Sequence, residues 1–207
     1  MSDEPLTLFD DWLDEQDAKN QTHIGDVHLV RNDDDMRNFL SWLHSHKRPI
    51  AYDIEATGLD IYSPTWEIKS IQFGDTVTAW VFLWAEPFFQ RSLDAVMQTD
   101  YVLLAHNATY DSLGLDRHNH VVADTLLRRT IDTKILAHLA DPRSPMEGGV
   151  GHALKNLSAH YVTSGAQDSQ AVLKKLFKRQ GWSKSTGWAK IPASHPTLVR
   201  YAGIDIS

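Results

Sequence analysis

The sequence contains no cysteine among its 207 residues. This absence excludes disulfide bonds, thiolate–zinc sites and cysteine nucleophiles, and it fits a reducing compartment. No apolar run reaches membrane-spanning length, and the N-terminus is acidic where a secretory signal would be basic. We therefore expect a soluble, cytoplasmic protein without membrane contact.

Basic residues are outnumbered, which gives a net charge of −7, an unusual value for a protein that binds nucleic acid. The charge is unevenly spread, because residues 1–35 hold eleven acids and two bases. Residues 169–204 hold seven bases and no acid. That stretch is suited to a phosphate backbone, although a solvated helix face explains it equally well.

The chain divides into an acidic N-terminal tail, residues 1–22, and one domain, residues 23–207, which we expect to be monomeric. Apolar alternation predicts early strands, and helical spacing dominates after residue 132. This order favours an α/β fold with a mixed central β-sheet flanked by α-helices. The predicted strands are 27–30, 50–55, 66–73, 77–82 and 102–105, with the third and fourth joined by a tight turn at Gly74-Asp75. The predicted helices follow caps at Asn32 and Asn107 and cover 132–140, 151–162, 168–179 and the stretch after Pro196.

The last predicted helix begins at a Ser194 cap with Pro196 in its first turn. The sequence ends at Ser207 with no helix stop signal. We therefore expect it to end inside a longer chain.

Two acids lie at alternate positions of the strand predicted at residues 50–55. Asp53 and Glu55 point to the same face, because side chains alternate along a strand. Two adjacent carboxylates at an apolar strand repel each other, so they need a cation or a raised pKa to remain there. The alternative is an exposed strand end whose acids face water.

A second segment carries Asn107, which can cap the following helix, and Asp111, which lies four residues on and shares its face. An ordinary cap and a first-turn acid would give the same pattern. A third segment carries Tyr201 and Asp205, again four residues apart. Asp205 lies late in its helix, where the dipole does not favour an acid.

Together, these segments supply what phosphodiester hydrolysis requires. Carboxylate oxygens suit hard cations such as Mg²⁺. Two such cations roughly 4 Å apart activate a water and stabilise the leaving oxygen. A tyrosine hydroxyl nearby can orient that water.

The order and spacing resemble the exonuclease family with motifs Asp-x-Glu, Asn-x-x-(Tyr/Phe)-Asp and Tyr-x-x-x-Asp. The matching residues are Asp53 and Glu55, then Asn107, Tyr110 and Asp111, then Tyr201 and Asp205. Arg200 stands where a sister branch has histidine. The segments DTKILAHLADP (132–142) and HALKNLSAHYV (152–162) further resemble the 3′-5′ proofreading exonuclease domain of family A DNA polymerases.

The resemblance implies a ribonuclease H-like fold and two divalent cations, Mg²⁺ or Mn²⁺. Asp53, Glu55 and Asp205 would hold the first cation, and Asp53 with Asp111 the second. Tyr201 would orient the attacking water. Leu59, Asn107 and Tyr110 would bind the 3′-terminal nucleotides, Leu59 as a wedge against the bases.

The same resemblance implies single-stranded or frayed DNA 3′ ends as partner, a covalently linked polymerase domain after residue 207, and a bacterial or phage-infected host cytoplasm. Ala56 departs from relatives that have a hydroxyl there. Without an ordered histidine pair, His106 and His152 are interpreted as structural. Trp182 and Trp188 are candidates for base stacking or for packing.

Three alternatives remain open at this stage. A ribonuclease D-like RNA exonuclease would use the same acids, because the choice of RNA rests on contacts to the 2′-hydroxyl. A non-catalytic module could keep the fold to bind nucleic acid. An acidic scaffold with accidental motifs ranks last.

Overall fold

The structure, a computed structural model, describes residues 26–46, 49–161 and 169–206. Within these ranges, strands join into one six-stranded mixed sheet with the order β1-β4-β3-β2-β5-β6. The predicted mixed sheet is therefore confirmed, whereas the acidic segment 1–22 lies outside the described residues. The strands are β1 (Asp26–Leu29), β2 (Ile50–Ala56), β3 (Ile68–Gly74), β4 (Thr78–Leu83), β5 (Leu103–Ala105) and β6 (Thr130–Asp132).

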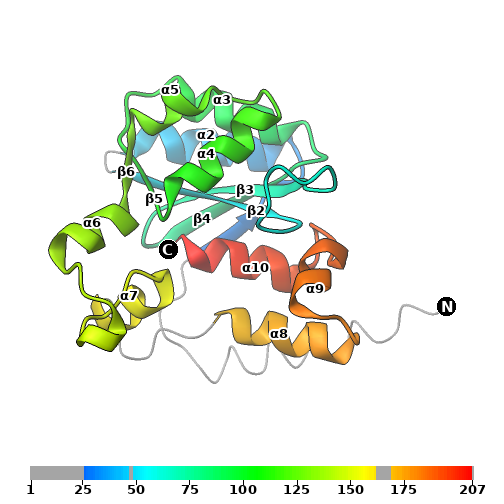
Figure 1. Cartoon of the computed structure of the whole chain (residues 1–207). Helices are drawn as coiled ribbons and strands as arrows, with labels where there is room; N and C mark the ends of the chain where they lie inside the picture. Colours follow the sequence, from blue (N-terminus) through cyan, green and yellow to red (C-terminus); the bar gives the residue numbers. More distant parts are fainter. Residues whose placement is uncertain (1–25, 47–48, 162–168, 207) are drawn as a thin grey trace.

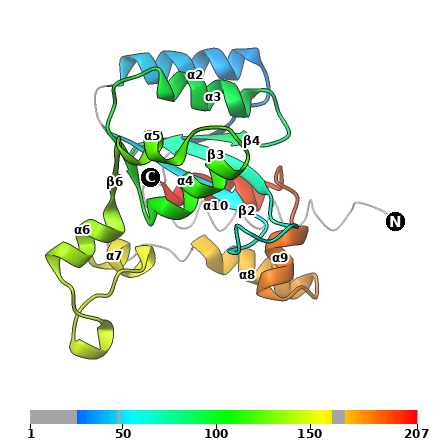
Figure 2. The same ribbon diagram turned by 45° about the horizontal axis from the view of Figure 1, so that its top comes forward.

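Helices cover both faces of the sheet (Figure 1). One face is covered by α2 to α5 and the other by α10, against which α8 packs, while α6 and α7 lie beside the β6 edge, as the turned view also shows (Figure 2). No described helix is both long and apolar enough to span a membrane. The helices are α2 (Asp33–Ser45), α3 (Phe88–Met97), α4 (Ala108–Arg117), α5 (Ala123–Leu127), α6 (Thr133–Ala140), the 3₁₀ turn η1 (Pro145–Glu147), α7 (Leu154–Tyr161), α8 (Ser169–Arg179), α9 (Lys184–Lys190) and α10 (Pro196–Asp205).

Strand β2 lies in the interior of the sheet, between two strands that come from different parts of the chain. It pairs with β3 in antiparallel register and with β5 in parallel register. The β3–β4 turn forms at the predicted Gly74-Asp75 step, where Asp75 Oδ1 accepts the backbone N–H groups of Val77 and Thr78, each at 2.8 Å. This arrangement places β2 under helices from both faces.

The buried apolar residues form two clusters. The larger cluster lies on the sheet and includes Phe39, whose ring meets Phe82 edge-on with centroids 4.8 Å apart. The smaller cluster joins α8, α9 and α10 and contains Phe177 and Tyr201. Trp182 and Trp188 pack against this second cluster, so packing is the observed role of these two rings.

The predicted N-cap of α2 is found in the structure, whereas that of α10 is not. Asn32 Oδ1 accepts the Asp35 N–H at 2.9 Å, as predicted. The prediction that Ser194 caps α10 is wrong, because His195 occupies the cap and its Nδ1 accepts the Thr197 N–H at 3.2 Å. An imidazole nitrogen therefore takes the acceptor position that was predicted for the serine hydroxyl. Four further elements, α3, α5, α9 and β6, were not predicted from the sequence.

Candidate active site

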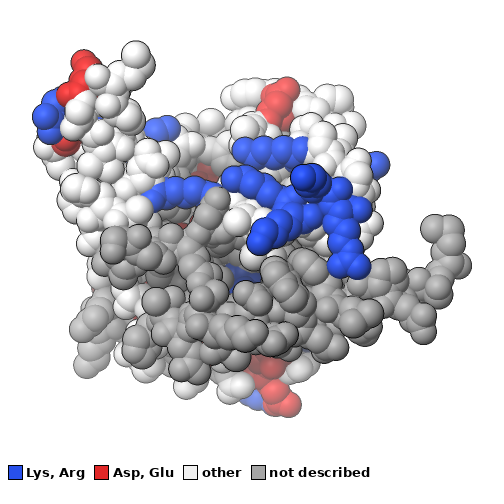
Figure 3. Space-filling view, turned by 90° about the horizontal axis from the view of Figure 1, so that it is seen from below, with Lys and Arg blue, Asp and Glu red and all other residues white. Residues whose placement is uncertain are grey.

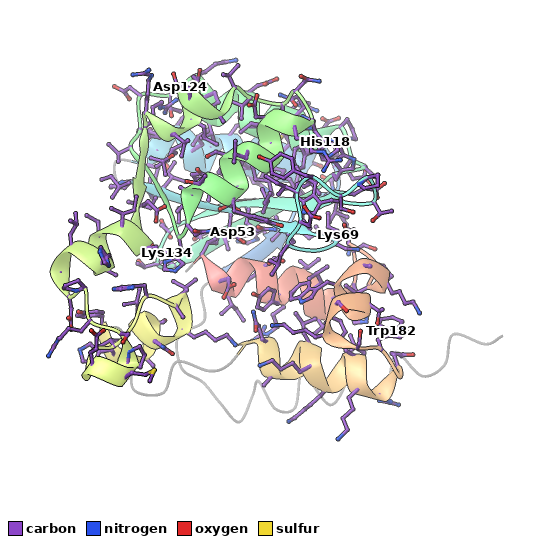
Figure 4. All side chains as sticks on the ribbon, in the orientation of Figure 1. Asp53, Lys69, His118, Asp124, Lys134 and Trp182 are labelled. Atoms are coloured by element: carbon purple, nitrogen blue, oxygen red, sulfur yellow. The ribbon has the colours of Figure 1, made fainter. Side chains whose placement is uncertain are left out.

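Strand β2 presents Asp53 and Glu55 on one face, as the alternation predicts. Opposite them on β3 lie Gln72 and Ser70, which pair with Asp53 and Glu55 respectively. Both are buried, and Gln72 Nε2 donates to Ser70 Oγ at 2.6 Å. A polar strip therefore lines the sheet beside the acids; in Figure 4, Asp53 lies on the central sheet next to α10.

Asp111 reaches this strand from α4. Its Oδ1 accepts the backbone N–H of Ile54 at 3.2 Å, between the two acids of β2. Asp111 is 2% exposed. The second motif is thus attached directly to the first.

Tyr201 and Asp205 share one face of α10, and they are bonded to each other. Tyr201 Oη donates to Asp205 Oδ2 at 2.7 Å, and Gln170 Nε2 of α8 donates to Tyr201 Oη at 3.1 Å. The tyrosine ring packs against Trp188, with centroids 5.6 Å apart. Gln170 was not identified from the sequence, because its role exists only once α8 lies against α10.

The four acids act on one another electrostatically. Burial, then Asp111, Glu55 and Asp205, raise the pKa of Asp53 well above its usual range. Burial, then Asp205 and Asp111, raise the pKa of Glu55 well above its usual range, against the opposing charge of Lys69. Burial raises the pKa of Asp111 to about 7. The structure therefore brings the four predicted carboxylates into one region of strong mutual repulsion.

The donor chemistry of this region fits a hard divalent cation, since four carboxylates and no thiolate are available. Among the described residues, however, no three His, Asp or Glu side chains already stand as a set able to ligate one ion. Asp205 is bonded to Tyr201 and Asp111 to the Ile54 amide.

A lysine that carries no sequence signal of a functional role lies near the acids. Lys69 is 9% exposed, and its Nζ donates to the carbonyl of Ile191 at 2.6 Å, just after α9. Burial lowers its pKa, whereas Glu67 and Glu55 act in the opposite direction. Lys69 thus links the sheet to α9 and offsets part of the negative charge at Glu55.

Asn107 begins α4 without capping it through its side chain. Its φ is 68°, in the left-handed region, which asparagine tolerates better than most residues. Asp132 takes over the cap, accepting the N–H groups of Asn107 and Ala108 at 3.0 and 2.9 Å. Asn107 therefore occupies the predicted cap position, but its side chain makes no cap hydrogen bond; instead Asn107 Oδ1 accepts from Lys134 Nζ at 2.9 Å.

The loop after β2 carries Leu59, whose side chain is 89% exposed. Tyr110 Oη donates to the Gly58 carbonyl at 2.6 Å and thereby fixes this loop to α4. The substrate-binding roles of Leu59, Asn107 and Tyr110 stay predictions. The contact of Tyr110 with Gly58 is a structural one.

His106 and His152 have structural partners. The His106 ring is 3.0 Å from Thr133 Oγ1 and 3.1 Å from the His152 carbonyl oxygen. His152 Nε2 lies 2.9 Å from the Asp141 carbonyl oxygen. These contacts agree with the interpretation of both residues as structural.

The raised pKa of Asp111 predicts a pH-dependent stability. Its pKa rises from an ordinary 3.8 to about 7 in the folded protein. Between these values the folded state binds more protons than the unfolded state, so stability falls as pH rises from about 4 to 7. In EDTA we expect the melting temperature of the wild-type protein to fall as pH rises from about 4 to 7. The fall should be shallower in Asp111→Asn. A wild-type melting temperature that does not change over this pH range would contradict a buried site of mutually repelling acids.

A mixed sheet with acids on its central strand and on helices from both faces defines a ribonuclease H-like exonuclease domain. The chain belongs to the 3′-5′ exonuclease family associated with family A DNA polymerases, whose model matches residues 27–206. The expected fold and 3′-5′ exonuclease function are thereby confirmed, and the protein is a nuclease.

Individual relatives agree with this family. The DNA polymerase of Mycobacterium phage D29 is 33% identical over 183 residues, covering 86% of this chain and 30% of the relative. The chain thus spans about 30% of the length of that relative. The match to the Aedes aegypti Nibbler EXO domain (TM-score 0.55, 20% identity) covers 90% of this chain and 84% of the Nibbler chain. The match to Trypanosoma brucei RNase D in complex with RNA U12 (TM-score 0.60, 14% identity) covers 89% of this chain and 60% of the RNase D chain. These two structures support the fold alone.

Proposed function

We propose that the chain removes nucleotides from DNA 3′ ends with two divalent cations, as the proofreading part of a family A DNA polymerase. The observation that carries this proposal is the convergence of Asp53, Glu55, Asp111 and Asp205: burial and neighbouring carboxylates raise the pKa values of Asp53 and Glu55, and burial raises that of Asp111. Such a set is costly without a cation, so its presence favours metal binding.

Asp53, Glu55 and Asp205 would hold one cation, and Asp53 with Asp111 the other. When bound, Mg²⁺ or Mn²⁺ supplies Lewis-acid activation of water and charge stabilisation at the leaving oxygen. The protein contributes position: β2 fixes two acids, and the Ile54 N–H orients Asp111. The hydrogen-bonded pair Gln72 and Ser70 lies opposite these two acids on the neighbouring strand β3.

Tyr201 would orient the attacking water. Burial, then Glu55 and Asp205, raise the pKa of its hydroxyl above the usual range, so the hydroxyl stays protonated at neutral pH and can donate. Gln170 and Asp205 hold it in place.

Tyr201→Phe is expected to lower the cleavage rate by about 10²-fold while metal affinity changes little, because one oriented hydroxyl is lost and every acid remains. Single-turnover rates and calorimetric Mn²⁺ titration measure the two effects. An unchanged rate would remove Tyr201 from the mechanism.

DNA is proposed as substrate because the phage relative is a DNA polymerase. Exposed Leu59 supplies a wedge for terminal bases. Basic residues gather over α8 on the face shown in Figure 3, where Lys174, Lys175, Lys178 and Arg179 are exposed. Phosphate contacts of this kind are independent of sequence.

The substrate assignment is tested with DNA and RNA single strands of one sequence, each 5′-labelled and degraded with Mg²⁺. Faster DNA degradation is expected. Faster RNA degradation would assign the chain to ribonuclease D-like RNA processing instead. No cleavage of either strand, with Mn²⁺ as well, would favour a non-catalytic binding module.

A further inference from the structure

The loop between β2 and β3 exposes a second large side chain besides Leu59. Tyr62 is 80% exposed, three residues after Leu59. Burying an aromatic ring is favourable, so an exposed tyrosine on an ordered loop is available for a ligand to cover. The loop begins directly after the strand end that carries Glu55.

Several hydrogen bonds hold this loop in one conformation. The Thr57 N–H donates to the Glu67 carbonyl at 3.0 Å, closing the base of the loop. Trp66 Nε1 donates to the Gly58 carbonyl at 2.8 Å, and Arg117 Nη2 to the Ser63 carbonyl at 2.9 Å. The exposed ring of Tyr62 is therefore presented by a tethered scaffold, which lowers the entropic cost of binding.

A surface hollow adjoins the ring. Its wall combines apolar side chains with a cation and an acid, and the Arg117 guanidinium also lies 5.7 Å from the centroid of the Trp66 ring. An aromatic face beside a cation is the combination that binds single-stranded nucleic acid through base stacking and phosphate contact. The hollow is lined by Ile61, Tyr62, Leu113, Asp116 and Arg117.

We propose that Tyr62 and this hollow form a nucleotide subsite for the strand upstream of the scissile bond. A base of the bound strand stacks on Tyr62, and its phosphate lies beside Arg117. The inference rests on the proposed exonuclease function and extends it beyond the 3′-terminal nucleotides. Stacking is tolerant of sequence, as proofreading requires, because every base has a π-face.

The test compares wild type, Tyr62→Ala and Tyr62→Phe on substrates of different length. The p-nitrophenyl ester of thymidine 5′-monophosphate has no upstream base, so all three proteins should hydrolyse it equally. On single-stranded oligonucleotides of two to eight nucleotides, Tyr62→Ala should lose about tenfold in kcat/KM above one threshold length, whereas Tyr62→Phe should not.

Abasic scanning identifies the stacked base. For the wild-type protein, one abasic position should lower kcat/KM as much as Tyr62→Ala does. On that same substrate, Tyr62→Ala should show no additional loss of kcat/KM. Equal kcat/KM for Tyr62→Ala and wild type at every length would overturn the subsite while leaving the exonuclease intact. Wild-type protein that cleaves no substrate would overturn the proposed function and the subsite with it.

Discussion

Replacing Asp53 with alanine is expected to abolish cleavage and, in the absence of divalent cations, to stabilise the fold. Asp53 is the acid that we place on both cations, so its loss removes a shared ligand. We expect the rate to fall by at least about 10³-fold, the upper range for losing one electrostatic group at a reacting centre.

The stability effect has the opposite sign because Asp53 is repelled by its neighbours. Its pKa is raised by burial and by Asp111, Glu55 and Asp205. Alanine removes that repulsion, which predicts a gain on the order of 1 kcal/mol in EDTA. Urea unfolding measures it, with the exposed acid Asp100→Ala as matched control, for which neither activity nor stability should change. Retained cleavage in Asp53→Ala would show that the site is misassigned.

Gly114→Val is expected to damage both the fold and the reaction. A Cβ at Gly114 would lie 2.7 Å from a ring atom of Trp66 and 2.9 Å from Ile54 Cδ1. Trp66 is buried and hydrogen-bonded to Gly58, so the ring has little freedom to move away. Helix α4 must then move off β2 and take Asp111 with it.

Overpacking of this kind costs about 1–3 kcal/mol. A shift of about 1 Å in a catalytic group costs about 10²-fold in rate. Gly58→Val is the matched control, because a Cβ there meets no atom within 4 Å. Unfolding and single-turnover cleavage measure both effects; a Gly114→Val protein with wild-type stability and rate would show that α4 tolerates displacement from β2.

The sequence predicted the elements whose signals are local. The alternation through β2 and the Gly74-Asp75 step between β3 and β4 depend on neighbouring residues, and both are found. Spacing within helices likewise placed Tyr201 and Asp205 on one face, where their side chains bond.

The missed features depend on tertiary contacts instead. Asp132 caps α4 from a distant strand, which leaves Asn107 in a left-handed conformation that no local pattern predicts. Lys69 and Gln170 likewise acquire partners only from α9 and α10. A lysine in a strand and a glutamine in a helix carry no sequence signal for such roles.

The central claim is that Asp53, Glu55, Asp111 and Asp205 form a metal-dependent 3′-5′ exonuclease site. The most direct measurement is a time course with Mg²⁺ on single-stranded DNA labelled at its 5′ end, for wild type and Asp205→Ala. We predict a ladder that shortens from the 3′ end in wild type, disappears in EDTA and is absent in Asp205→Ala. An equal ladder in both proteins, or one that persists in EDTA, would contradict the claim.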